Sequence, residues 1–180
     1  TPLYSSAASD VYKRQAIAYA SEAVASLSAE RLRGLVNDAV AFNEAADITG
    51  VLLFDGHRFL QYLEGPQQGV DAAWRRILDS SSHHSVVELN RGRIGRRQFS
   101  HWRMGWLQVE HTALGRVALS DWTGFVRSTA LSGIPTSALD RLQLLTAPLL
   151  RADQGGPMMQ AAPAGAVSYT HLRAHETSLH

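Results

Sequence analysis

Two apolar runs, at residues 48–54 and 57–63, stand on either side of Asp55-Gly56 and set the most informative pattern in the chain. An Asp-Gly pair between two such runs favours a β-hairpin, because a two-residue type I′ turn needs positive φ at both central residues. A turn centred on Asp55-Gly56 fixes the pairing of the two strands. We therefore expect Gly50 to lie opposite Gln61.

One face of this hairpin is apolar except for a single amide. Side chains alternate along a strand, so the residues on that face are Gly50, Leu52, Phe54, Phe59, Gln61 and Leu63. A glycine opposite Gln61 leaves space beside its amide, and a glycine in a strand often marks close approach of a ligand or of backbone. Gln61 is either a buried amide that points into a pocket or an edge amide bound to water, and the hairpin alone leaves both readings open.

The spacing of apolar residues predicts two helices, one on each side of the hairpin in the chain. Ser28 has the position of an N-cap for a helix that runs to about Asn43, and residues 69–79 form the second helix. Asn43 takes the next place on the apolar stripe of the first helix. It is either a core-facing amide that needs partners or a cap that bonds only backbone.

The remaining apolar segments complete a sheet. We expect strands at residues 16–20, from residue 86 onward and at residues 99–107, with Trp102 and Met104 on one face of the last. The order is βαββαβ plus one strand. This order predicts an α+β, ferredoxin-like βαββαββ sheet, antiparallel or mixed, with two helices on one face.

C-terminal helices are expected to cover the other face of the sheet. Two amphipathic segments, at residues 121–131 and 137–150, suit that role, and Ile134-Pro135 separates them. We therefore expect two parts, a ferredoxin-like domain at residues 16–110 and a C-terminal helical cap at residues 111–150.

Both ends of the chain have a different character. Residues 1–15 and 168–180 fit no pattern of a folded domain, and we expect them to be non-native tails. Residues 151–167 are rich in Gly, Pro and Ala, which is typical of a loose linker within a C-terminal extension at residues 151–180.

Composition and charge exclude several classes of protein. The chain of 180 residues has no cysteine, which rules out disulfides and thiolate metal sites, and we expect no metal site. Its formal charge of +1 favours no particular partner. No apolar run approaches the ~20 residues that span a bilayer, and no secretory pattern is present at the start, so we expect a cytoplasmic protein without membrane attachment.

An ordered set of residues resembles the BLUF family, sensors of blue light using FAD. The set comprises Tyr19, Asn43, Asp-Ile-Thr-Gly at 47–50, Phe-Leu-Gln-Tyr-Leu-Glu-Gly at 59–65 and Trp-Arg-Met at 102–104. A lone Tyr or Gln carries no information, whereas this set, in this order and on this fold, is specific. The resemblance covers residues 16–107.

The resemblance implies roles for the residues that match. The flavin ring would lie between the two helices against the sheet, with Asn43 holding its carbonyl and N–H edge and Gln61 between Tyr19 and the ring. Phe59, Ile77 and His83 would complete the cofactor site, and Trp102 and Met104 would relay the signal.

The resemblance also implies the chemistry, which is that of a photoreceptor and not of an enzyme. Light-excited flavin would take an electron and then a proton from Tyr19. The Gln61 amide, which carries both a donor and an acceptor, would end rotated or tautomerised with a stronger hydrogen bond to the flavin C4 carbonyl. Light would then act on a protein signalling partner or on further copies of the chain.

One departure from the family concerns the cofactor. Ser80 and Ser82 stand where the family commonly has Asp and Arg, and an arginine at the latter place would neutralise the flavin phosphate. FAD is the expected cofactor, with FMN or riboflavin as alternatives of similar affinity. Arg31, Arg33, Arg75 and Arg76 are the arginines considered as substitutes.

Two rival functions use the same fold. A nucleic-acid-binding module would use the basic cluster of Arg91, Arg93, Arg96 and Arg97, but the central hairpin positions offer only one aromatic, Tyr62, for base stacking. A hydrolase of acylphosphatase type would need an arginine in the loop after the first strand, and residues 21–24 contain none. Nucleic acid is therefore not the expected partner.

Overall fold

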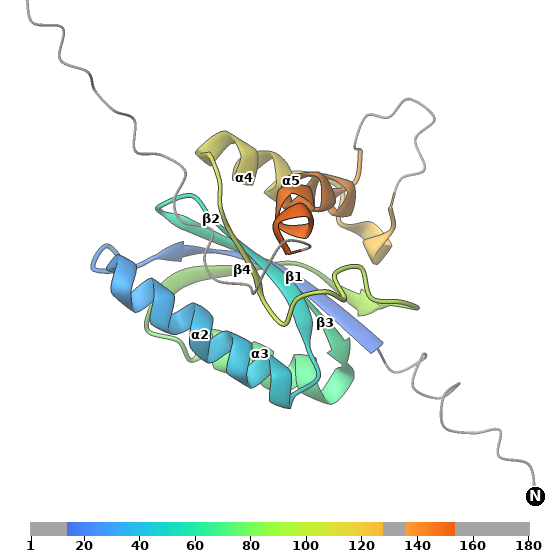
Figure 1. Cartoon of the computed structure of the whole chain (residues 1–180), viewed down its shortest axis with the longest axis horizontal. Helices are drawn as coiled ribbons and strands as arrows, with labels where there is room; N and C mark the ends of the chain where they lie inside the picture. The colour runs from blue at the N-terminus through green and yellow to red at the C-terminus, as the bar shows by residue number, and fades with distance from the viewer. Residues whose placement is uncertain (1–13, 128–135, 154–180) are drawn as a thin grey trace, which may run out of the picture.

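Five strands form one mixed sheet in the order β4-β1-β3-β2-β5 (Figure 1). This computed structural model describes residues 14–127 and 136–153. Strand β1 pairs antiparallel with β3 and with β4, the central strand β3 pairs antiparallel with β2 as well, and β5 lies parallel to β2. The strands are β1 (Arg14–Ala23), β2 (Thr49–Phe54), β3 (Arg58–Pro66), β4 (His83–Arg93) and β5 (Gly105–Gln108).

Helices cover both faces of this sheet, and each face has its own apolar core. Figure 1 shows α2 (Ala29–Ala45) and α3 (Gln67–Leu78) on one side, with α4 (His111–Ala118) and α5 (Ala138–Asp153) on the other. The ferredoxin-like order with helices on both faces is confirmed. None of the helices that the structure describes is both long and apolar enough to cross a bilayer.

The hairpin between β2 and β3 forms, but its turn is centred one residue later than predicted. Phe54 pairs with Phe59 and Leu52 with Gln61, so the central residues are Gly56 and His57. Gly56 has φ +95°, which is typical of the first central position of a type II′ turn. The Asp55 carboxylate accepts hydrogen bonds from the backbone N–H groups of His57 and Arg58, which holds Asp55 beside the turn instead of within it.

The expected pairing of Gly50 with Gln61 is therefore wrong, although both residues stay on the predicted face. Gly50 lies opposite Leu63, and a Cβ placed on it would stand 2.2 Å from the carbonyl oxygen of Tyr62. The glycine marks a close approach of backbone at Leu63, and it is not the source of open space beside Gln61.

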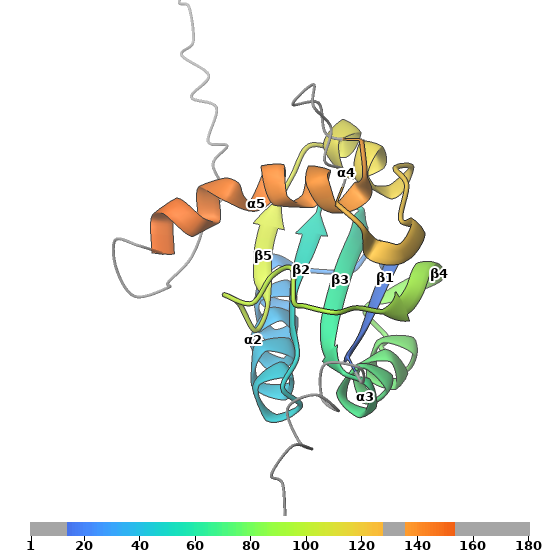
Figure 2. The same ribbon diagram turned by 90° about the vertical axis from the view of Figure 1, so that its right-hand side faces the viewer.

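The last strand is shorter than predicted. β5 begins at Gly105, and residues 94–104 form an irregular segment that crosses β3 and β2 on its way from β4 (Figure 2). Trp102 belongs to the core beneath α4 and α5, whereas Met104 belongs to the core beneath α2 and α3. The expectation that these two side chains share one strand face is wrong, because the segment that carries them is not a strand.

The helix expected at residues 121–131 is also absent from the part of that range that the structure describes. A 3₁₀ turn, η1 (Thr123–Phe125), stands there, and the positive φ of Gly124 and Phe125 breaks any continuous helix. Phe125 packs edge-on against Tyr62, with 5.4 Å between ring centroids, so tertiary packing overrides the amphipathic pattern. Helix α4 was not predicted from the sequence, whereas the helix expected at residues 137–150 forms as α5.

The predicted ends of the chain fall mostly on residues that the structure does not describe. Ile134-Pro135, residues 1–13 and residues 154–180 lie outside the described part. Within it, β1 begins at Arg14 and α5 continues to Asp153. The first tail is thus at least two residues shorter than expected, and the C-terminal linker at least three.

Gly50 offers a test of the hairpin packing. Gly50→Ala should lower the free energy of unfolding by about 1–3 kcal/mol, because a rigid backbone oxygen cannot move away from the new methyl group. Gly34→Ala is the matched control, since nothing lies within 4 Å of its added Cβ in α2, and it should raise stability by ~0.5–1 kcal/mol. Urea unfolding of both variants measures the difference, and equal stability of Gly50→Ala and the parent protein would contradict the observed packing.

Candidate functional site

A buried chain of three side chains crosses the α2/α3 side of the sheet. Tyr19 on β1 lies directly opposite Gln61 on β3, and its hydroxyl donates to Oε1 of Gln61 at 2.5 Å. The other end of the amide, Nε2, donates to the sulfur of Met104 at 3.3 Å. The three residues are only 4%, 6% and 2% exposed, so the Gln61 amide is buried, as one of its two readings required.

The surroundings of Tyr19 keep its phenol neutral. Burial raises the pKa of Tyr19 well above the usual value of a tyrosine, so the hydroxyl retains its proton at neutral pH. Its ring contacts Trp74 of α3 edge-on, with 5.5 Å between centroids. In this arrangement the phenol donates to the amide oxygen, and the NH₂ group of Gln61 is directed toward Met104.

Asn43 is the second buried amide of this region. Within α2, all of which the structure describes, it is the one buried residue, and its Nδ2 donates to the backbone carbonyl of Arg103 at 2.6 Å. The side chain therefore faces inward and bonds a distant segment. The side chain bonds backbone, as the capping alternative expected, but the carbonyl belongs to Arg103 and not to α2, whose C-cap is Ala46.

Apolar side chains of β3, α2 and α3 lie on the same side of the sheet as these two amides. Phe59 is buried on β3 and Ile77 is half-buried on α3. The apolar stripe of α2 remains only half-buried along its whole length, at Leu32, Leu35, Val36, Ala39 and Val40. An apolar stripe left incompletely covered, beside two buried amides, suits a flat ring with apolar faces and a polar edge, so the residues present fit a flavin.

His83 stands at the border of this region and is held by the protein itself. Its Nδ1 lies 2.7 Å from the Ser21 hydroxyl, and its Nε2 lies 2.8 Å from the Ile77 carbonyl oxygen. Its ring meets Phe59 edge-on with 6.2 Å between centroids. Because both ring nitrogens already have partners, His83 is placed as a wall of the site.

The serine loop after α3 has one arginine in contact with it. Ser82 is buried, and its carbonyl accepts from the backbone N–H of Val24. Ser81 is exposed, and its hydroxyl accepts from the Arg31 guanidinium at 3.0 Å. Among the four arginines considered as substitutes, Arg31 therefore bridges α2 and the loop, whereas Arg76 lies over the ring of Phe42.

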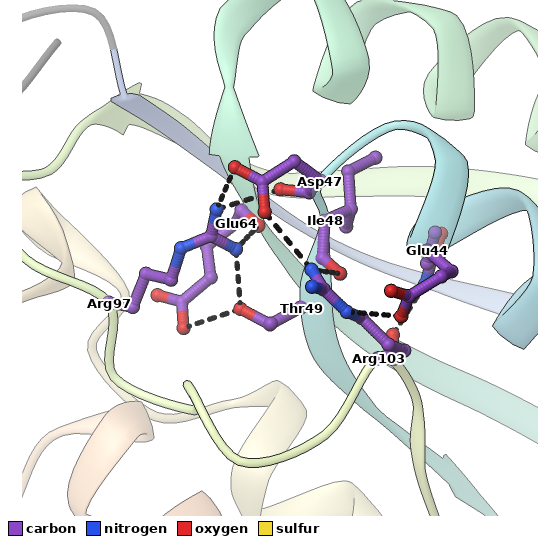
Figure 3. A network of polar contacts seen from close by, with 8 residues as sticks. Glu44, Asp47, Ile48, Thr49, Glu64, Arg97 and Arg103 are labelled. Carbon is purple, nitrogen blue, oxygen red and sulfur yellow. Dashed lines mark hydrogen bonds and ion pairs between the residues drawn. The ribbon is translucent and has the colours of Figure 1, made fainter.

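Two polar residues that contact the segment before β5 were not predicted from the sequence to belong to the site. Arg103 presents its carbonyl to Asn43, and its side chain pairs with Glu44 at 2.6 Å and with Asp47 at 3.1 Å (Figure 3). Glu64 is fully buried and accepts from the backbone N–H groups of Gln98 and Phe99. The one signal for Glu64 was an acidic residue within an apolar strand run.

Burial and hydrogen bonds act on Glu64 in opposite directions. Desolvation raises its pKa above the usual value of a carboxyl group, and the two backbone donors and the Tyr62 hydroxyl oppose that rise. The same surroundings raise the pKa of Tyr62, mainly through burial. Glu64 therefore serves the crossing segment as a buried acceptor in place of a strand partner.

Comparison with known proteins agrees with the geometry. Residues 15–105, half of the chain, match a family described as sensors of blue-light using FAD, BLUF. The chain belongs to the BLUF family. Within that family it is a flavin-using blue-light photoreceptor with the ferredoxin-like fold.

Individual relatives match at different lengths. The blue light- and temperature-regulated antirepressor BluF of Escherichia coli K12 is 38% identical over 60 residues, which are 33% of this chain and 15% of that protein. Klebsiella pneumoniae BlrP1, in its calcium and cyclic-diGMP complex, is 25% identical over 75% of this chain and 34% of its own, with a TM-score of 0.56. The dark-state structure of the BLUF protein BlrB shows the fold alone, at 20% identity, a TM-score of 0.54 and coverage of 82% and 89%. The chain thus spans only a small part of the first two relatives.

Two of the four arginines in the basic cluster that a nucleic-acid-binding module would use form ion pairs within the domain. Arg91 pairs with Asp71 and Glu88, and Arg97 pairs with Asp47. These two arginines serve the fold of the domain, which agrees with the BLUF assignment and does not favour the alternative.

Proposed function

We propose that the domain binds its flavin between α2 and α3 and that Gln61 is the group whose hydrogen bonds change under blue light. The observation that carries this proposal is the position of its amide between the Tyr19 hydroxyl and the Met104 sulfur. A thioether is a weak acceptor, so the NH₂ group of Gln61 is the end that exchanges its partner most easily. The amide oxygen has the stronger bond, to a phenol.

The other residues hold the cofactor or shape its surroundings. Asn43 offers an inward-facing amide to a polar ring edge, and Phe59, Ile77 and His83 supply walls. FAD is the cofactor of the family. When bound, the flavin supplies a strong, light-activated oxidant next to the site.

Tyr19 is the residue suited to donate an electron to that oxidant. Its buried phenol carries a proton at neutral pH and already shares a short hydrogen bond with the amide oxygen of Gln61. Loss of an electron makes a phenol strongly acidic, so its proton leaves along this bond. The electron and the proton then return to Tyr19, so that no net oxidation remains, and the Gln61 amide is left reoriented or tautomerised with its NH₂ group turned away from Met104.

The signal is proposed to leave through the crossing segment. Met104 contacts the switch, and Trp102 packs on the other side of the sheet. Trp102 and Phe99 line a cavity of about 290 Å³ together with Gln143, Thr146 and Leu150 of α5. A change at Met104 therefore reaches the α5 layer, whose partner we propose to be another protein or a second copy of the chain, as the antirepressor name of the E. coli relative suggests.

Three variants separate the switch from cofactor binding. Gln61→Leu should abolish the reversible red shift of the flavin band while flavin stays bound, because leucine keeps the volume and loses both hydrogen-bonding groups. Tyr19→Phe should also abolish the shift, since the hydroxyl is gone. Asn43→Ala should mainly weaken flavin binding, because its role is to hold the ring. Light-minus-dark absorption spectra of the purified variants provide the measurement.

Tyr62→Phe is the matched control for Tyr19→Phe. It removes the same hydroxyl from a buried tyrosine that belongs to the opposite core, where that group bonds Glu64. The red shift should persist in this control. A normal red shift in Gln61→Leu would overturn the proposed switch even if the protein proved yellow.

Arg31 is proposed as the cation for the flavin phosphate that the serine loop does not provide. Arg31→Gln should raise the dissociation constants of FAD and FMN about five- to tenfold and leave that of riboflavin unchanged, because one charge-assisted contact is lost. Arg33→Gln, an exposed neighbour on α2, is the control. Fluorescence titration with the three flavins tests this assignment, and an unchanged ratio of FMN to riboflavin affinity in Arg31→Gln would refute it.

A further inference from the structure

The two amides of the site meet at adjacent residues of the crossing segment. Asn43 donates to the carbonyl oxygen of Arg103 at 2.6 Å, and Gln61 donates to the sulfur of Met104 at 3.3 Å. Residues 103–104 precede β5 and have no strand partner of their own. The backbone on either side is held, at Trp102 by the Gly50 N–H and at Gly105 by β2, and residues 103–104 themselves are held by side-chain contacts.

The Arg103 side chain makes those contacts with the end of α2. Its Nε lies 2.6 Å from Glu44, and its Nη1 lies 3.1 Å from Asp47 and 3.4 Å from the Ile48 carbonyl oxygen (Figure 3). One guanidinium thus joins the last turn of α2, at Glu44, to the two residues that precede β2, Asp47 and Ile48. Asn43 belongs to the same last turn of α2, so the helix end that carries the amide also carries the ion pairs.

We call the contacts of the Arg103 side chain with Glu44, Asp47 and the Ile48 carbonyl the clamp. Asp47 extends this clamp to a second arginine. Its other carboxylate oxygen accepts from Arg97 at 2.8 Å, so a single aspartate bridges both ends of the segment 97–103 (Figure 3). Asp47 follows the C-cap of α2 with φ +52°, a conformation that favours glycine or asparagine. An aspartate in this conformation costs some backbone energy, and its carboxylate forms two ion pairs. The ion pairs, and not the helix end alone, therefore account for the presence of aspartate at position 47.

We propose that Arg103 is a positioning residue of the light switch, whose side chain holds its own carbonyl and the Met104 sulfur in place for the Asn43 and Gln61 amides. This inference rests on the proposed function of Gln61. In darkness the two amides donate to fixed acceptors. After illumination, the Gln61 amide must return to the same acceptor, and its return is faster when that acceptor is already in position.

Removal of the clamp should therefore lengthen the lit state without abolishing it. Arg103→Gln should keep bound flavin and a red shift of normal size, and its dark recovery should be about three- to fivefold slower, the scale expected for partly exposed ion pairs. Arg103→Lys, which keeps the charge, should recover closer to the parent rate. Arg96→Gln is the matched control, because Arg96 is an exposed arginine of the same segment, and it should recover like the parent.

A second readout needs no flavin. Met104 is one of three methionines, and the others, Met158 and Met159, lie in the C-terminal extension. In flavin-free protein labelled with ¹³C at the methionine methyl groups, the Met104 signal should move toward the position of an unpacked methionine in Arg103→Gln and stay in place in Arg96→Gln. Glu44→Gln, which removes one ion-pair partner, should show a smaller change in the same direction.

The outcomes separate the two proposals. A parent protein without a red shift overturns the proposed function, whatever the methyl spectra show. A parent with a normal red shift, together with Arg103→Gln and Glu44→Gln variants that recover at the Arg96→Gln rate and keep the Met104 signal, overturns the role of Arg103 alone. If Arg103→Gln does not fold, Glu44→Gln carries the test by the same two readouts.

Discussion

The antiparallel pairing of β1 with β3 is the constraint on which the site depends. It places Tyr19 directly opposite Gln61, so that a phenol and an amide meet at hydrogen-bonding distance. Because side chains alternate along a strand, a slip of one residue would turn Tyr19 to the opposite face of the sheet. β1 has ladders on both sides: the ladder with β3 runs unbroken through Tyr19, whereas the ladder with β4 shifts register between Ala18 and Tyr19. The Tyr19–Gln61 pair is thus positioned by the β1–β3 backbone pairing, and α2 adds the Asn43 amide.

The crossing segment gives the domain a short connection between its two cores. Trp102 belongs to one core and Met104 to the other, and Arg103 alone separates them in the chain. The backbone at Trp102 is itself tied to β2, since the Gly50 N–H donates to its carbonyl oxygen. Under the proposed function, a displacement of Met104 would be shared with a bulky ring that belongs to the same core as α5. An event at one amide would then reach the far side of the sheet.

Polar groups in unusual positions stabilise this irregular segment. Its backbone N–H groups have no strand ladder, and the carboxylate of Glu64 accepts two of them within the α4/α5 core. A buried carboxylate is costly, and the raised pKa of Glu64 reflects that cost. Asp47 takes the complementary role at the surface, where it joins two arginines of the segment to the end of α2. Both acidic residues hold a segment that has no strand partner: Glu64 accepts its backbone N–H groups, and Asp47 pairs with its arginine side chains.

The sequence by itself determined the features that depend on local chemistry and periodicity. The N-cap at Ser28, the hairpin, the order of elements and the face that carries Gln61 were all predictable, because each follows from neighbouring residues. The ordered set of Tyr19, Asn43 and Gln61 was sufficient to indicate the family. Only the tertiary structure decided which turn residues set the hairpin register, that Trp102 and Met104 diverge, and that Asn43 bonds Arg103. The hairpin register depends on the local hydrogen bonds that Asp55 accepts beside the turn, which the Asp-Gly pattern does not specify. The other two features arise from contacts between residues far apart in the chain, and a hydrogen bond of fixed length and angle forms only after packing has brought both partners into place.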